Sequence, residues 1–143
     1  MANSAGNATT LLSQEWQTLH QDHERYDRYG LLIKLTAVIV SLLALALGMT
    51  LLLTLIFVLI LWLQEGIWRT IQARTSDRLL EIERLLALPG EHVGLQFYSA
   101  WQATRPGTVG LLKEYLRNSL RPTVAYPYVI LLALEILAAL FYF

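Results

Sequence analysis

The stretch that decides the fold is Leu35–Gln64, LTAVIVSLLALALGMTLLLTLIFVLILWLQ, thirty consecutive residues without an ionisable side chain. As a single helix it would be about 45 Å long at 1.5 Å per residue, which exceeds the roughly 30 Å hydrocarbon core of a bilayer. A helix in the core of a water-soluble domain would not be apolar on every face over this length. The stretch therefore predicts membrane-spanning structure and excludes a soluble single-domain enzyme.

The stretch has one internal break, Gly48-Met49-Thr50, where glycine tolerates any backbone angle and a small polar residue follows. We expect a tight helical hairpin that turns near 48–50, because each half is then about as long as one transmembrane helix. A third apolar stretch, Tyr126–Phe143, predicts a C-terminal span. The expected fold is an all-α integral membrane protein with three transmembrane helices and amphipathic cytoplasmic helices. Its segments are an N-terminal amphipathic helix (1–28), the transmembrane hairpin (29–68), a cytoplasmic helical segment (69–125) and the C-terminal transmembrane helix (126–143).

The basic residues predict the orientation of these spans. Three of the eleven lie between Arg25 and Lys34, and the other eight lie between Arg69 and Arg121. By the positive-inside rule, the N-terminus and residues 69–125 are expected in the cytoplasm, and the turn and the C-terminus on the opposite side. The expected location is the bacterial inner membrane. Four residues suit the membrane–water interfaces, namely Lys34, Trp62, Trp68 and Tyr126.

The predicted cytoplasmic segments carry apolar stripes at helical spacing. The apolar positions are Leu12, Trp16, Leu19 and Tyr26 in the first segment, Leu79, Ile82, Leu85 and Leu86 in the second, and Val109, Leu112, Tyr115, Leu116 and Leu120 in the last. Ser76 and Asp77 are expected to cap a new helical turn, Thr108 to cap the last helix, and Pro89-Gly90 to end the second. Either the stripes pack on each other or lie on lipid headgroups, or one of them docks a partner protein.

Glu135 lies about ten positions, hence roughly 15 Å, inside the third span. A carboxylate at this depth costs about 2.5 to 3.5 kcal/mol on insertion scales, so it is expected to face other helices or a water-filled cavity. One interpretation is a proton or cation site, or a pore-lining ring in an oligomer. The other is an interhelical hydrogen bond, to Ser41 or to a symmetry-related copy. Ser41 lies at about the same depth as Glu135.

Small residues recur on one face of the first span and beside Glu135, where they would let two helix backbones approach closely. The predicted packing stripe is Ala37, Ser41, Ala44, Gly48, Ala138 and Ala139. The first and third spans are therefore expected to touch, within one copy or between copies.

Several functions are disfavoured by composition. The net charge is zero, so nucleic acid is not an expected partner, and with no cysteine a thiolate nucleophile is excluded. His20, His23, Glu24 and Asp27 have spacings that could hold a metal, but on a polar helix this pattern is more typical of a solvated face. No catalytic signature is present. We therefore expect no enzyme activity, no metal and no cofactor.

Two hypotheses remain for function. The first is a non-enzymatic small integral membrane protein that acts by helix–helix self-association, as a homo-oligomeric pore or effector with a buried acidic site at Glu135. The second is an accessory or structural subunit of a larger membrane complex. The layout of residues 29–88 resembles the two-span membrane effectors of bacterial anti-phage systems called SLATT proteins, and the third span departs from that layout. The expected partners are the lipid bilayer and either further copies of the chain or other membrane subunits.

Overall fold

A computed structural model describes residues 2–88, 96–104 and 106–142, and within them it contains five helices and no strand. The helices are α1 (Ala2–Ala46), α2 (Leu51–Ala87), α3 (Phe97–Thr104), α4 (Thr108–Ser119) and α5 (Pro122–Tyr142). Three of them, α1, α2 and α5, are long and apolar enough to cross a membrane. The all-helical class and the three candidate spans expected from the sequence are confirmed.

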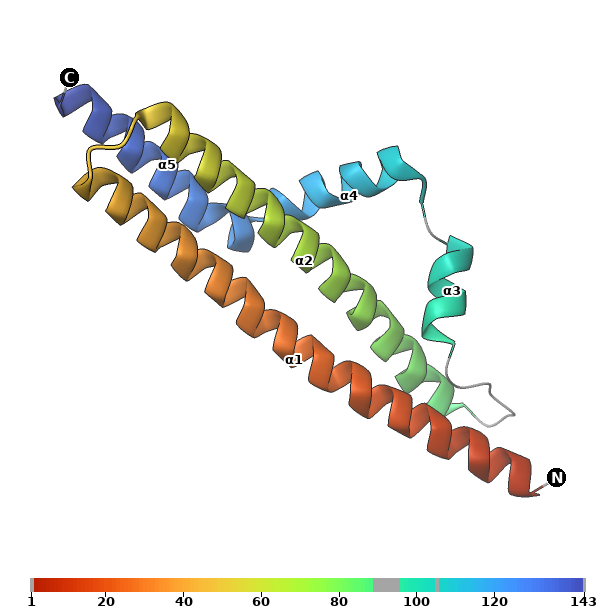
Figure 1. The fold of residues 1–143 in the computed structure, drawn as a ribbon. Helices are drawn as coiled ribbons and strands as arrows, with labels where there is room; N and C mark the ends of the chain where they lie inside the picture. The colour runs from red at the N-terminus through yellow and green to blue at the C-terminus, as the bar shows by residue number, and fades with distance from the viewer. Residues whose placement is uncertain (1, 89–95, 105, 143) are drawn as a thin grey trace.

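The helices α1 and α2 form a long antiparallel hairpin (Figure 1). Between them, Gly48 adopts a φ of +61°, a conformation that glycine reaches without the steric cost other residues meet. The backbone N–H of Met49 donates to the Ala44 carbonyl over 2.9 Å and so closes the end of α1. The chain turns at the residues where the sequence breaks its apolar run.

The hairpin is much longer than a bilayer is thick. At 1.5 Å per residue, the 45 residues of α1 and the 37 of α2 extend for about 68 and 55 Å, whereas the 21 residues of α5 extend for about 31 Å. Figure 1 shows α5 alongside the turn end of the hairpin, with the C-terminus beside the turn and the N-terminus at the far end. The molecule therefore has a three-helix section (residues 29–68 and α5) and a two-helix arm (residues 9–28 and 70–87).

The arm has its own small apolar core. Leu12 and Leu19 of α1 are buried against Leu79 and Ile82 of α2. Trp16, Leu85 and Phe97 pack around these four residues. In this part of the chain the predicted stripes pack on each other.

The three-helix section is held by a second core. Ala37, Val58 and Tyr128 are fully buried, one from each of the three candidate spanning helices. Around them pack Leu61, Trp62, Leu131 and Leu132. The outward side chains are large and apolar on all three helices; they include Leu31, Ile39 and Leu42 on α1, Leu52, Ile56 and Ile60 on α2, and Val129, Leu134 and Leu140 on α5. Such a continuous apolar exterior is far larger than soluble monomers expose.

Two predicted helix caps are wrong. The helix α2 runs without interruption through Ser76 and Asp77, because buried residues on either side, Thr75 and Leu79, continue the same packed face. Thr108 is the first residue of α4, and the cap is Gly107, with no side-chain cap hydrogen bond. The helix that contains the third apolar stretch begins at Pro122, before Tyr126, since proline suits the first turn of a helix, where the backbone N–H has no partner.

The expected stop at Pro89-Gly90 lies outside the described residues.

Candidate functional site: two polar groups among the spanning helices

Glu135 and Ser41 lie opposite each other at the contact between α5 and α1. Glu135 is 4% exposed and Ser41 is 3% exposed. Among the described residues, neither Ser41 Oγ nor Glu135 Oε1 has a hydrogen-bond partner. The structure thus brings the buried carboxyl group of Glu135 and the buried hydroxyl group of Ser41 together between the two helices, with Glu135 Oε1 left unpaired.

A groove of about 420 Å³ adjoins Glu135 at the turn end of the bundle. Its lining includes four residues of the predicted packing stripe: Ala44, Gly48, Ala138 and Ala139. The other two members, Ala37 and Ser41, are buried closer to the middle of α1. Small side chains from α1 and α5 therefore share one hollow with the carboxyl group, and the first and third spans touch within one copy.

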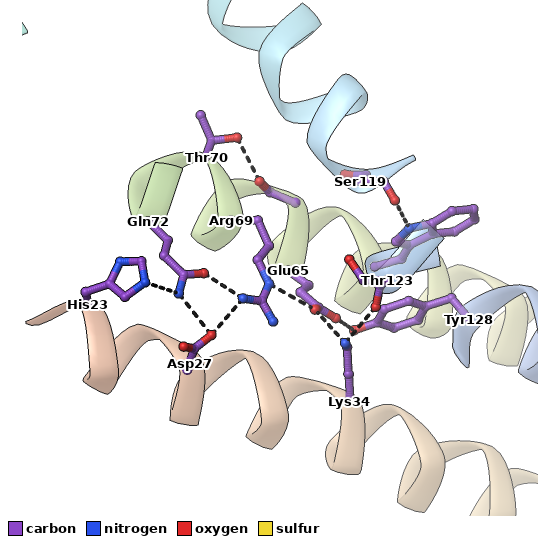
Figure 2. A network of polar contacts seen from close by, with 12 residues as sticks. His23, Asp27, Lys34, Glu65, Arg69, Thr70, Gln72, Ser119, Thr123 and Tyr128 are labelled. Carbon is purple, nitrogen blue, oxygen red and sulfur yellow. Dashed lines mark hydrogen bonds and ion pairs between the residues drawn. The ribbon is translucent and has the colours of Figure 1, made fainter. Parts of the chain in front are cut away.

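A second polar group surrounds Glu65, a residue that was not among the predicted site residues. Glu65 is fully buried on α2. It forms ion pairs with Lys34 Nζ at 3.2 Å and Arg69 Nε at 3.6 Å, and it accepts a hydrogen bond from the Tyr128 hydroxyl at 2.9 Å (Figure 2). These four residues are called the Glu65 cluster below. All three spanning helices contribute to it, so it joins them at the end where α5 begins.

Lys34 contacts Glu65 of this cluster and also the first turn of α5. Besides the ion pair, its ammonium group donates to the carbonyl oxygen of Thr123 over 3.0 Å. Its side chain is 24% exposed. Lys34 therefore lies close to the start of α5 and connects it to α1, rather than reaching the deeper Glu135.

A polar layer continues from the cluster into the arm. Arg69 donates to Asp27 at 2.9 Å and to the Gln72 side-chain oxygen at 2.6 Å. The Gln72 amide nitrogen in turn donates to Asp27 at 2.9 Å and lies 3.4 Å from His23 Nε2. Gly30 makes room for this layer, because a Cβ atom there would lie 3.2 Å from the Arg69 guanidinium.

The aromatic residues predicted at the interface lie at the same end of the three-helix section. Trp62 stacks on Tyr128, with ring centroids 5.9 Å apart, and its indole N–H donates to the Ser119 carbonyl at 2.8 Å. Trp68 lies between Tyr26 and Tyr29, at centroid distances of 5.4 and 5.3 Å. Tyr126, near the start of α5, is 70% exposed.

The sequence did contain a signal for the Glu65 cluster. Lys34 and Glu65 flank the uncharged run, each just outside one of its ends and at comparable distances from the turn. Residues at comparable distances from a tight turn face each other in an antiparallel hairpin. Opposite charges in these two places indicate an ion pair. Neither residue lies inside the uncharged run itself.

The helix α4 turns its polar face toward the hairpin. The side-chain amide of Asn118 donates to Thr70 over 2.7 Å, and Arg74 forms an ion pair with Glu114 at 2.7 Å. At the crossing, Gly66 of α2 lies directly under Ser119. Most of the predicted stripe of α4 faces outward instead. Its members Val109, Leu112, Leu116 and Leu120 are exposed, and Tyr115 is half-buried.

Within residues 2–88, 96–104 and 106–142, no group of three or more histidine, aspartate or glutamate side chains could hold a metal ion. His20 forms a long ion pair of 3.8 Å with Glu24 and stacks on Trp16. No protein-family model, curated protein or solved structure matches this chain.

Proposed function

We propose that this chain is an integral membrane protein that acts without catalysis, by assembling with further copies of itself through the groove between α1 and α5. The observation that supports this is the buried carboxyl group of Glu135, which has an unpaired oxygen in a hollow lined by small residues. Lipid chains offer no hydrogen-bond partner, and an unsatisfied polar group in hydrocarbon costs several kcal/mol. A protein partner in the groove removes that cost.

A second copy of the chain is the partner that fits best. Small residues along α1 and α5 permit close helix approach, which drives association inside membranes. Around a symmetry axis, each copy brings the same surface to the axis, so the grooves that adjoin Glu135 in neighbouring copies face each other. A ring of this kind encloses a polar path, as a pore or an ion-responsive effector requires.

The orientation is part of the same proposal. All eleven basic residues belong to the arm, to the Glu65 end of the spans or to the segment between α2 and α5. We place that side, including the N-terminus, in the cytoplasm of a bacterial cell, and the turn and the C-terminus across the inner membrane. The chain has no cysteine, so single substitutions report topology directly. Met49→Cys should react with a membrane-impermeant maleimide in intact cells, and Gln17→Cys only after permeabilisation; the reverse pattern refutes the orientation.

Assembly is tested by measuring particle mass in nanodiscs for the singly expressed protein. Ala139→Leu fills the groove, whereas Ala133→Leu adds the same side chain at an exposed position of the same helix. We expect a defined multi-copy particle that Ala139→Leu dissociates and Ala133→Leu leaves intact. Equal behaviour of the two variants would contradict the groove as the interface.

Conduction is tested separately with Glu135→Gln, which keeps the size of the side chain and removes its charge. A pore predicts ion flux into liposomes that this substitution abolishes. A stable oligomer without flux leaves a scaffolding role. A chain that is monomeric and unstable when expressed alone supports the second hypothesis, an accessory subunit of a larger membrane complex.

A further inference from the structure

A pocket of about 370 Å³ lies beside the Glu65 cluster, between α1, α2 and the beginning of α5. The polar side chains in its lining are His23, Arg69, Gln72, Ser76, Arg121 and Thr123. Two arginines, an imidazole, an amide and two hydroxyls are the groups that bind phosphate oxygens in proteins. We propose that this pocket binds the phosphate group of an anionic phospholipid in the leaflet where α5 enters the membrane, an inference that rests on the proposed membrane insertion.

The charges around the pocket leave one cation without a counter-ion. The carboxylate of Asp27 is already paired with Arg69. The carboxylate of Glu65 is already paired with Lys34 and Arg69. Within the described residues, no carboxylate pairs with Arg121. Its guanidinium group is therefore the principal contact for an incoming anion, since arginine can donate two parallel hydrogen bonds to one phosphate.

One ring nitrogen of His23, in the lining of the pocket, is available for a hydrogen bond to a ligand. His23 Nδ1 is buried and, among the described residues, has no hydrogen-bond partner. The pocket lies at the first turn of α5, where Thr123 and Val124 line it. Pro122 has no N–H, and the N–H groups of Val124 and Ala125 donate to the Arg121 carbonyl, so the helix start contributes only the positive end of its dipole. The helix start adds to a site that the arginine and histidine side chains define.

The position of α4 argues for a lipid as the source of the phosphate. Two residues separate α4 from α5, and α4 faces outward with an apolar stripe in which Val109 is 83% exposed. Lys113 and Arg117 are also exposed on this helix. An amphipathic helix with basic residues, joined directly to a span, is typical of a helix lying on an anionic membrane surface. Lipid headgroups then lie at the level of Arg121.

The experiment counts the phospholipids that remain bound to the full-length protein. Nanodiscs contain phosphatidylglycerol and phosphatidylcholine in equal amounts, and native mass spectrometry of the released protein reports the lipids retained by each chain. We expect selective retention of phosphatidylglycerol, and a loss of about five- to tenfold in Arg121→Gln. Arg117→Gln, which removes the same charge one helical turn away from the pocket, should retain the lipid as the parent does.

Three results would overturn the proposal. Equal loss in Arg117→Gln and Arg121→Gln indicates diffuse attraction to a basic surface. Displacement of the lipid by millimolar inorganic phosphate, or phosphate binding in pure phosphatidylcholine discs, identifies a soluble anion as the ligand. Retention by Arg121→Gln that equals the parent removes the assigned contact.

Two controls separate this test from the proposed function. Helicity by circular dichroism verifies that Arg121→Gln folds, and Arg121→Lys should recover part of the binding. A protein released from membranes by alkaline carbonate refutes membrane insertion itself. A membrane-embedded monomer that retains phosphatidylglycerol refutes self-association and leaves the lipid site standing.

Discussion

The hydroxyl group of Tyr128 on α5 donates a hydrogen bond of 2.9 Å to Glu65 on α2, and both side chains are fully buried. In the proposed membrane setting, apolar packing between the three candidate spans gains little, because lipid chains are as apolar as leucine. Polar contacts therefore have a large part in deciding where a third helix docks. The bond between these two residues fixes the height of α5 against the hairpin. Lys34 of α1 adds contacts with Glu65 of α2 and with the Thr123 carbonyl of α5.

Tyr128→Phe should lower the free energy of unfolding by about 1 to 2 kcal/mol, since it removes one hydrogen bond to a charged group and leaves the ring in place. Tyr126→Phe is the matched control, because Tyr126 is exposed on the same helix. Thermal unfolding in detergent, followed by loss of helicity, compares the two variants. Equal stability of both would show that the hydrogen bond does not hold α5.

Glu65→Gln should be more damaging, by about 3 to 5 kcal/mol, because two cations then remain near a buried site without their counter-charge. Adding Lys34→Met to this variant removes one of those cations and should restore part of the stability. The measurement is the unfolding midpoint in the same detergent for the two single variants and the double variant. Additive losses would contradict coupling between Lys34 and Glu65.

Gly66→Ala should displace α4 from the hairpin. A Cβ atom at this position would lie 1.8 Å from Ser119 Oγ and 3.0 Å from the Tyr115 carbonyl oxygen, so backbone must move. Overpacking of this kind costs about 1 to 3 kcal/mol. Amide hydrogen exchange should rise across residues 108–119. Gly6→Ala, where a Cβ atom meets nothing within 4 Å, should leave exchange in α4 unchanged.

Glu15→Gln should destabilise the arm by about 1.5 to 3 kcal/mol, because Arg78 loses hydrogen bonds to a charged group but keeps its ion pair with Glu81 at 2.9 Å. Glu15 and Arg78 form a pair with contacts of 2.9 and 3.3 Å, and both side chains are almost completely buried. Glu24→Gln breaks an exposed pair with His20 and should cost at most about 1 kcal/mol. Protease cleavage within the arm, measured at increasing temperature, distinguishes the two. Equal protection would show that burial does not strengthen the Glu15–Arg78 interaction.

Some features of this fold are local and were predictable from the sequence. The uncharged run is longer than one bilayer crossing needs, and Gly48 is where the chain can turn back at low cost. The burial of Ser41 and Glu135 agrees with the expectation that polar side chains in an apolar helix face other helices. Boundaries were less predictable. Ser76-Asp77 has the composition of a helix cap, yet α2 continues through it, because packing against α1 outweighs a local capping preference.

The sequence by itself determined the three apolar helices, the hairpin turn and the distribution of basic residues, because each depends on composition or on neighbours along the chain. Only the tertiary structure decided that Glu65 is held by Lys34, Arg69 and Tyr128, that Glu15 meets Arg78, and that α4 turns its apolar stripe outward. Each of these depends on which helix faces lie against each other and on their relative height. In the sequence, a charged residue at the end of an apolar run, such as Glu65, indicates only where the run ends. It becomes buried among three helices once α5 packs against the hairpin at the same height.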